Sequence, residues 1–256
     1  MKNKNYLKIL ITVLLVFNLF ALSACSDALE WAYLKYGNNA VFNNYDVFLN
    51  EENYLYRIVN NNVPNFDLKK YDGKAFEHYS DLDELGRCGP AEALIGEEIM
   101  PELSEKRGSI GMIKPSGWPA TQVKYDIVEG KYLYNRCHLI GWQLSAENAN
   151  KKNLITGTSW LNRKAMLPYE QQVANYIRAT HNHVLYRVTP IFEGNNLVAS
   201  RIQIEALSYE DRGIGIKMNI LLENYQPGIH IDYATGDSYE EVVNGNRKGS
   251  HSSPVQ

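Results

Sequence analysis

Four residues between positions 136 and 162 have the types and spacing that phosphodiester hydrolysis requires. Arg136 and His138 lie two positions apart in the run YLYNRCHLI, and Asn153 and Asn162 follow. A neutral imidazole can take a proton from water, a guanidinium can meet phosphate charge, and a carboxamide oxygen can hold a hard cation. Together they predict a single-metal site for hydrolysis of a phosphodiester.

A β-hairpin is expected to carry the first two of these residues. Its strands are predicted over residues 121–128 and 131–140, because β-favouring residues flank a turn at Glu129-Gly130. Side chains alternate between the two faces of a strand, so Arg136 and His138 should point the same way.

The two asparagines are expected on a loop and at the start of a helix. Residues 141–158 carry Asn153 and are predicted to be a loop, and residues 160–180 carry Asn162 and have a helical pattern. Pro168 must kink or restart that helix, because proline has no N–H to donate. Two strands, a loop and a helix around one His form the order of a ββα-metal (His-Me finger) motif.

The remaining pattern predicts an α+β fold with a central antiparallel sheet. A short helix is expected from Pro90 through Met100, because proline suits the first turn of a helix. Two strand pairs are expected after the long helix, namely 183–192 with 197–208 and 216–225 with 229–234.

With these residues in place, the chain resembles the DNA/RNA non-specific endonuclease family, in particular its exported branch of streptodornase-like and DNA-entry nucleases. The resemblance covers roughly residues 60–240 and is strongest in the runs NRCHLIGWQL, NLITGTSWLN, HVLYRVTPIFEGNNLVA and QPGIHIDYATGDS. The family signature is Asp-Arg-Gly-His, where this chain has Asn-Arg-Cys-His at 135–138. Arg136 and His138 are therefore kept, while the other two positions differ.

The resemblance implies a role for each candidate residue. His138 would be the general base, and Arg136 would offset charge on the transition state. Asn162 would be the sole protein ligand of Mg²⁺, with Mn²⁺ as a substitute, while Asn153 would help to hold the site. Glu170, eight residues after Asn162, would touch a water on the metal.

The first 24 residues have the pattern of a bacterial lipoprotein signal peptide. A basic start, MKNKNYLK, precedes an apolar run that is short for a membrane-spanning helix. The run ends in Leu22-Ser23-Ala24-Cys25, which resembles a lipobox, so Cys25 is expected to carry the lipid. The mature protein would be exported and anchored to the outer face of a bacterial membrane, and ordinary secretion is the alternative.

Two further cysteines, Cys88 and Cys137, remain in the expected mature chain. Disulfides form in exported proteins, and two cysteines allow one internal pairing. A bridge would fasten the strand that carries His138. Two buried free thiols are the alternative, because sequence alone does not bring the two Cα atoms together.

Charge is unevenly distributed along the chain. The formal net charge is −3, yet residues 106–187 hold twelve Lys and Arg against four Asp and Glu. A basic segment around the motif is typical of a site for an anionic polymer, here DNA, with RNA also open. Five of these residues are expected to contact phosphate: Arg107, Lys151, Lys152, Arg163 and Lys164. The alternative interpretation is that each is an ordinary solvated surface residue.

Nearby aromatic and histidine side chains give weaker signals. Stacking on bases is one interpretation of Tyr132 and Tyr134, but packing on the strand is favoured. His181, His183 and His230 are expected to be structural, because no Cys/His spacing suits a zinc site.

These patterns divide the chain into four parts. Residues 1–24 form the signal peptide, 25–65 an Asn-rich tether with a short helix near 27–35, 66–240 the nuclease domain and 241–256 a polar tail. The favoured function is a Mg²⁺-dependent endonuclease that cleaves DNA with little sequence specificity and leaves 5′-phosphates. The alternative is a lipoprotein that binds nucleic acid without cleaving it, which would have no need of a general base.

Overall fold

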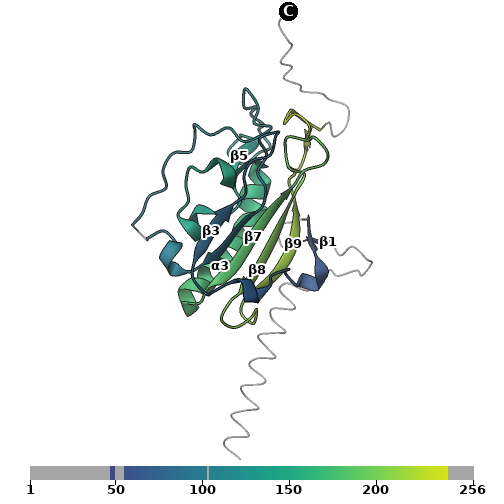
Figure 1. Cartoon of the computed structure of the whole chain (residues 1–256). Helices are drawn as coiled ribbons and strands as arrows, with labels where there is room; N and C mark the ends of the chain where they lie inside the picture. Colours follow the sequence, from purple (N-terminus) through teal and green to yellow (C-terminus); the bar gives the residue numbers. More distant parts are fainter. Residues whose placement is uncertain (1–46, 50–54, 103, 242–256) are drawn as a thin grey trace, which may run out of the picture.

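A seven-stranded antiparallel sheet forms the centre of the molecule. The computed structural model describes residues 47–49, 55–102 and 104–241, and Figure 1 shows the sheet running diagonally through them. The strands lie in the order β1-β2-β9-β8-β7-β4-β3, and every neighbouring pair is antiparallel. Their bounds are β1 Val47–Leu49, β2 Leu55–Ile58, β3 Phe76–Tyr79, β4 Ala91–Ile95, β7 Val184–Ile191, β8 Arg201–Ser208 and β9 Lys217–Glu223.

Two small sheets and several helices complete the fold. β5 (Tyr134–His138) pairs with β6 (Leu154–Thr158), and β10 (Ile229–Ile231) pairs with β11 (Ser238–Glu240). The helices are η1 Asn60–Asn62, η2 Leu68–Lys70, η3 Glu97–Ile99, α2 Trp142–Ser145, η4 Lys151–Asn153, the π-helical η5 Leu161–Met166 and α3 Leu167–Thr180. Within the described part of the chain, none of them is long and apolar enough to cross a membrane.

The main core joins the large sheet to α3. Val173, Ala174 and Ile177 of α3 are fully buried together with Val188 of β7 and Ile204 of β8. Removal of such side chains from water is the main favourable term in folding, so α3 has a fixed place against the sheet. A second, smaller core cluster packs the start of β5 against β10. Its buried residues are Tyr125, Val128, Leu133, Tyr134, Ile229 and Ile231.

The helix expected from Pro90 through Met100 is wrong. Its residues 91–95 form β4, which pairs with β3 on one side and with β7 on the other. Ala93, Leu94 and Ile95 are fully buried there. Ala, Glu and Leu favour helices in isolation, but pairing at both edges and complete burial outweigh that local preference.

One of the two strand pairs expected after the long helix is confirmed. β7 pairs with β8 along its whole length, from Val184 opposite Ser208 to Ile191 opposite Arg201. The second pair is wrong, because β9 pairs with β8 and β2, whereas β10 pairs with β11.

The tether expected over residues 25–65 is wrong for its described part. β1 and β2 extend the large sheet beyond β9. Asn62 Nδ2 donates to the carbonyl of Lys217, and Asn62 Oδ1 accepts from the N–H of Asn219. Residues 55–62 therefore pack onto β9, and the folded domain begins before residue 66.

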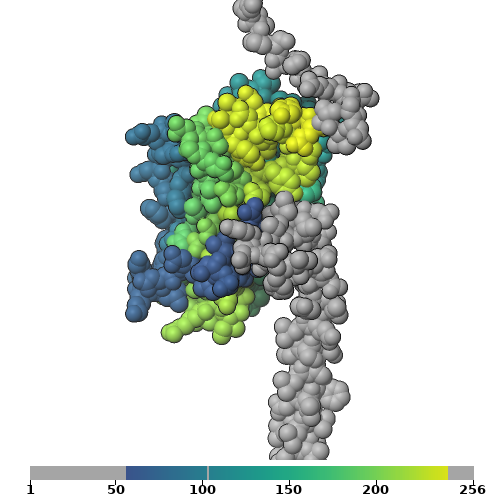
Figure 2. All heavy atoms as spheres, turned by 90° about the vertical axis from the view of Figure 1, so that its right-hand side faces the viewer, coloured from purple at the N-terminus to yellow at the C-terminus, as the bar shows by residue number. Residues whose placement is uncertain are grey.

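Several expectations fall on segments outside the described residues. These are the signal peptide over 1–24, the lipid at Cys25, the helix near 27–35 and the tail from residue 242 onward. Figure 2 shows the last described residues, in yellow, gathered at one end of the domain.

Candidate active site

The strand that carries Arg136 and His138 pairs with β6. Arg136 lies opposite Thr156, and His138 lies opposite Leu154. All five residues of β6, with the sequence LITGT, are buried. This burial explains why a segment that sequence patterns assigned to a loop forms a strand.

Two expectations about this region are therefore wrong. The 121–128 segment forms no strand beside β5, and its one β-bridge within the described residues joins Lys124 to Tyr132. The loop expected over 141–158 instead contains α2, η4 and β6.

The helix that carries Asn162 begins directly after β6. Its helical turns run from residue 159 to Thr180, which confirms the expected helix. Thr158 caps it, because Thr158 Oγ1 accepts a hydrogen bond from the third residue of the first turn across 2.9 Å. Pro168 lies in the first turn of α3, directly after the π-helical turns of η5 end. Proline has no N–H to donate, and this change of helix type is where one hydrogen bond is lost.

The ring of His138 is held at both nitrogens. Its Nε2 lies 2.8 Å from the carbonyl of Asn148, which can only accept, so Nε2 carries the hydrogen. Its Nδ1 lies 3.0 Å from Nη2 of Arg107, which can only donate, so Nδ1 offers a lone pair. These two contacts select one neutral tautomer of the imidazole.

The surroundings of His138 also keep it neutral. Burial and, to a smaller extent, the positive charge of Arg107 lower the pKa of His138 to about 4, against the opposing effect of the Asn148 carbonyl. An imidazole with this pKa is unprotonated at neutral pH and can accept a proton at Nδ1.

Asn153 fixes the chain immediately after His138. The Asn153 side chain is fully buried. Its Oδ1 accepts from the N–H of Ile140, and its Nδ2 donates to the carbonyl of Ile140, each across 2.9 Å. The Asn153 carbonyl also accepts from the N–H of Leu139. This geometry suits the supporting role predicted for Asn153.

Asn162 faces a groove beside the β5–β6 hairpin. The groove has a volume of about 610 Å³ and is lined by, among others, Arg107, Arg136, Asn162 and Arg163. The Asn162 side chain is half-buried, and its carboxamide has no hydrogen-bond partner within the described residues. A free carboxamide oxygen is a suitable ligand for Mg²⁺, which prefers oxygen and keeps several waters. The described residues hold no group of three or more His, Cys, Asp or Glu arranged for a metal ion.

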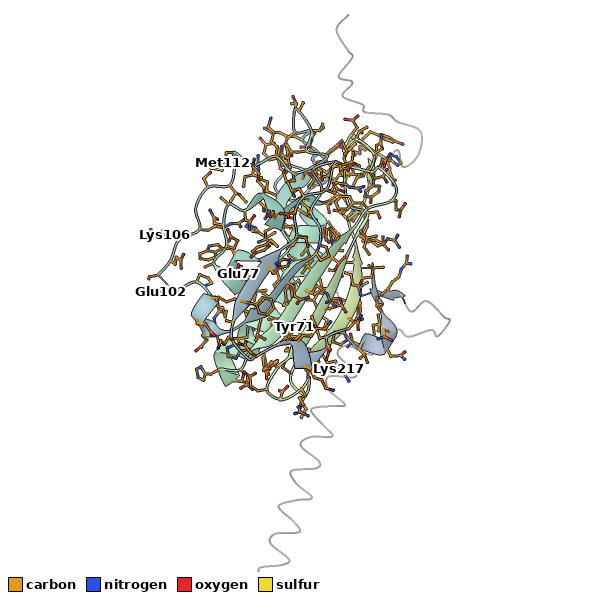
Figure 3. The ribbon with its side chains drawn as sticks, in the orientation of Figure 1. Tyr71, Glu77, Glu102, Lys106, Met112 and Lys217 are labelled. Carbon is orange, nitrogen blue, oxygen red and sulfur yellow. The ribbon has the colours of Figure 1, made fainter. Side chains whose placement is uncertain are left out.

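Arg136 is hydrogen-bonded to an irregular loop that precedes β5 in the chain. Its Nη2 donates to the carbonyl of Gly111 across 2.7 Å, and its Nε donates to the carbonyl of Ile113. The guanidinium also stacks over the ring of Trp118 at 4.2 Å. Arg136 therefore helps to hold the loop that carries Arg107, and Figure 3 shows Lys106 and Met112 of this loop at the edge of the domain.

Glu170 is a buried carboxyl group next to the turn that follows β5. Burial raises the pKa of Glu170 to about 7, while a hydrogen bond from Gln143 and the charge of Arg107 act in the opposite direction. The Gln143 Nε2 atom lies 3.3 Å from its Oε2. A Cβ at position 141 would lie 2.7 Å from the same oxygen, so Gly141 leaves the room that this carboxyl occupies.

The structure separates the five basic candidates. Arg107 contacts His138, and Arg163 lines the groove with its Nη1 3.8 Å from a carboxylate oxygen of Glu129. The other three, Lys151, Lys152 and Lys164, do not line the groove. Lys151 and Lys152 lie in η4. Lys152 forms an exposed ion pair with Asp81 at 2.6 Å.

The aromatic and histidine candidates also differ from one another. Both tyrosines line the groove, but Tyr134 is buried in the smaller core, as packing on the strand predicts, whereas Tyr132 is 46% exposed. His183 is hydrogen-bonded to carboxylate oxygens of Glu98 and Glu210, which agrees with a structural role.

Cys88 and Cys137 are free and buried, so the proposed disulfide is wrong and the alternative of two thiols holds. Cys88 Sγ donates to the carbonyl of Leu154 across 3.2 Å, and Cys137 Sγ contacts Met166 Sδ at 3.5 Å. Burial raises the pKa of Cys88 to about 11, which leaves its thiol protonated and unreactive at neutral pH.

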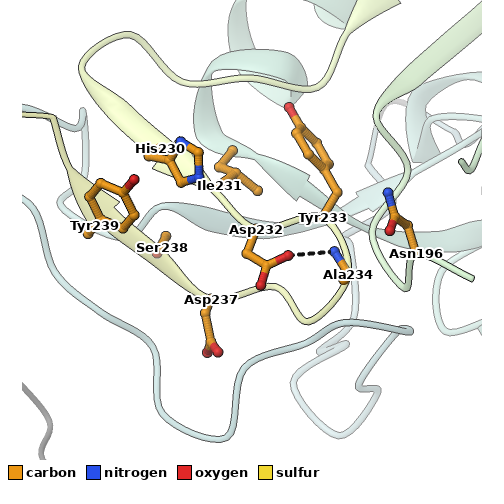
Figure 4. A pocket seen from close by; sticks show the side chains of 9 residues that line it. All are labelled: Asn196, His230, Ile231, Asp232, Tyr233, Ala234, Asp237, Ser238 and Tyr239. Atoms are coloured by element: carbon orange, nitrogen blue, oxygen red, sulfur yellow. Dashed lines mark hydrogen bonds between the residues drawn. The ribbon is translucent and has the colours of Figure 1, made fainter.

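A second cavity, of about 430 Å³, lies at the β10–β11 hairpin, and none of the residues expected to act in catalysis, metal binding or phosphate binding lines it. Figure 4 shows Asp232 accepting from the N–H of Ala234 and His230 beside Tyr239, whose rings stack at 4.5 Å. The carboxylates of Asp232 and Asp237 would repel phosphate, so this cavity does not suit the same ligand.

Sequence comparison and structural comparison agree. The sequence pattern described as DNA/RNA non-specific endonuclease matches residues 67–209. NucA from Streptococcus agalactiae with no metal bound has a TM-score of 0.62 at 24% identity, covering 73% of this chain and 87% of that one. The magnesium-bound form has a TM-score of 0.61 at 22% identity, covering 83% and 95%. Sda1 nuclease with bound zinc has a TM-score of 0.59 at 24% identity, covering 69% and 93%. The expected α+β fold with its ββα unit is thereby confirmed.

Proposed function

The chain belongs to the DNA/RNA non-specific endonuclease family, and from that premise we propose that it is an exported, Mg²⁺-dependent endonuclease that cleaves DNA with little sequence specificity. RNA is a second substrate to be tested. The observation that carries the proposal is the buried, neutral His138, whose Nδ1 accepts a hydrogen bond from Arg107, and Arg107 lines the same groove as the free carboxamide of Asn162.

His138 supplies the proton acceptor in this mechanism. Its Nδ1 would take a proton from the attacking water, while the hydrogen bond from Nε2 to the Asn148 carbonyl holds the ring in position. Arg107 occupies Nδ1 in the absence of substrate and must first move to a phosphate oxygen. The loop contacts of Arg136 use its Nε and Nη2 atoms, so other N–H groups of the guanidinium remain available. These would offset charge on the pentavalent phosphorus.

Asn162 would hold the divalent cation through its carboxamide oxygen, with Mn²⁺ as a substitute for Mg²⁺. Bound there, the cation would neutralise phosphate charge and stabilise the departing 3′-oxygen, which leaves a 5′-phosphate. Asn153 holds the chain beside His138, and the buried Glu170 would accept a hydrogen bond from a water of the site. Arg163 would contact a neighbouring phosphate from the wall of the groove.

Export and lipid anchoring at Cys25 complete the proposal, and the lipobox-like residues 22–25 support them.

Nicking of supercoiled plasmid tests the proposed activity. Purified protein should convert plasmid to open circles with Mg²⁺ and fail to do so with a chelator. Retarded migration of the plasmid without any nicking, at every metal tried, would favour a nucleic-acid-binding lipoprotein that does not cleave.

A further inference from the structure

The first turn of the helix that carries Asn162 takes one of its hydrogen-bond acceptors from a distant segment. Thr158 Oγ1 accepts from the N–H of Leu161 across 2.9 Å, as a helix N-cap does. The N–H of Trp160 donates to Oε1 of Gln226 across 3.1 Å. The first N–H groups of a helix have no partner within the helix, so these two acceptors fix the turn on which Asn162 lies.

The segment around Gln226 is itself fastened to the body of the protein. Asn224 is fully buried, and its Nδ2 donates to the carbonyls of Thr156 and Ala199 across 3.1 and 2.8 Å. Its Oδ1 accepts from the N–H of Thr158 across 2.9 Å. Residues 224–226 follow β9 directly, so they connect the large sheet to the end of β6 and to the start of the helix.

We propose that Gln226 is a positioning residue for the cation-binding carboxamide of Asn162. The inference rests on the proposed function, in which that carboxamide is the protein's direct contact with the cation. Loss of a group that orients a metal ligand typically costs about tenfold to a hundredfold in metal affinity. Gln226 is only 5% exposed, and its proposed role follows from its contact with the N–H of Trp160.

The test compares the wild type with Gln226→Met, which keeps an unbranched side chain and removes the oxygen acceptor. Mn²⁺ binding is measured by electron paramagnetic resonance, and the Mg²⁺ dependence of plasmid nicking is measured in parallel. Mn²⁺ affinity should fall about tenfold, the Mg²⁺ concentration for half-maximal nicking should rise similarly, and the rate at saturating Mg²⁺ should stay near that of the wild type.

Gln203→Met is the matched control. Gln203 Nε2 donates to Asn219 Oδ1 across 2.8 Å within the large sheet, so this variant loses a comparable hydrogen bond away from the groove. Its Mn²⁺ affinity should equal that of the wild type. Normal Mn²⁺ affinity in folded Gln226→Met, or an equal loss in Gln203→Met, would overturn the inference.

Asn162→Ala separates this inference from the proposed function. If Asn162→Ala binds Mn²⁺ normally, the assignment of the metal ligand is at fault; if it loses Mn²⁺ while Gln226→Met does not, only the role of Gln226 is at fault. If circular dichroism shows that Gln226→Met does not fold, Gln226→Asn replaces it, because the shorter side chain stays polar and withdraws the acceptor from the N–H of Trp160. Gln226→Asn must then bind Mn²⁺ more weakly, and normal affinity in it overturns the inference.

Discussion

Arg107 donates a hydrogen bond from Nη2 to Nδ1 of His138 across 3.0 Å. The nitrogen that a general base needs therefore already has a hydrogen-bond donor in this structure, and that donor is a cation on an irregular loop. A phosphate is a strong acceptor for a guanidinium. Binding of a phosphodiester would therefore draw Arg107 away from His138 and free Nδ1 for water.

Arg107→Ala should uncover His138 and weaken cleavage at the same time. Diethyl pyrocarbonate should modify His138 faster than in the wild type, because Nδ1 has lost its donor. The cleavage rate should fall by about 10²-fold, the usual loss for one transition-state donor. Lys106→Ala, on the same loop, is the control and should modify at the wild-type rate. Equal protection of His138 in Arg107→Ala would show that the contact does not persist in solution.

The pH dependence of cleavage should report Glu170. Its pKa is raised to about 7, so the carboxyl is protonated below that pH, and cleavage should increase as pH rises through it. The pKa of His138 is lowered to about 4, so His138 stays neutral over the same range. Glu170→Gln should be slower and should lack the increase near pH 7. An unchanged pH–rate profile in this variant would assign that titration to another group.

Asn153→Ala should destabilise the protein strongly. It leaves the buried N–H and carbonyl of Ile140 without partners, and each such group costs about 1–3 kcal/mol. The free energy of unfolding in urea should fall by about 2–6 kcal/mol, the sum for two such groups. Asn150→Ala, which removes a single acceptor for the N–H of Lys152, should cost clearly less. Equal losses in the two variants would refute the special role of Asn153.

Cys25→Ala should release the protein from membranes, or stall its processing, without reducing nuclease activity. The lipid would be attached at the mature N-terminus, more than one hundred residues before His138 in the chain. Cell fractionation followed by plasmid nicking measures both effects. Wild-type protein found only in the culture fluid would instead identify an ordinary secretion signal.

The placement of candidate residues that lie close together in sequence could be predicted, whereas contacts from distant segments could not. His138, Asn153 and Asn162 lie within one continuous segment that forms β5, η4, β6 and η5. Their spacing in the sequence therefore indicates that they lie near one another in the fold. Arg107 reaches His138 from an irregular loop that has no periodicity, and only its charge marked it as a candidate.

Local patterns also failed where tertiary contacts decide the structure. β4 has a helix-favouring composition, yet β3 and β7 pair with both of its edges. β6 follows an Asn-rich stretch that suggests a loop, yet it is buried throughout. The sulfurs of Cys88 and Cys137 contact different partners instead of each other. The directions of these two side chains decide this outcome, and the sequence does not specify them.

The proton acceptor is the centre of this account, and His138→Ala tests it most directly. Plasmid cleavage at saturating Mg²⁺ should fall by about 10²-fold or more, as is typical for loss of a general base. DNA binding, measured by fluorescence anisotropy with a chelator present, should stay near that of the wild type, because basic side chains supply the affinity. Cleavage at more than about a tenth of the wild-type rate, well above that typical loss, would contradict the account.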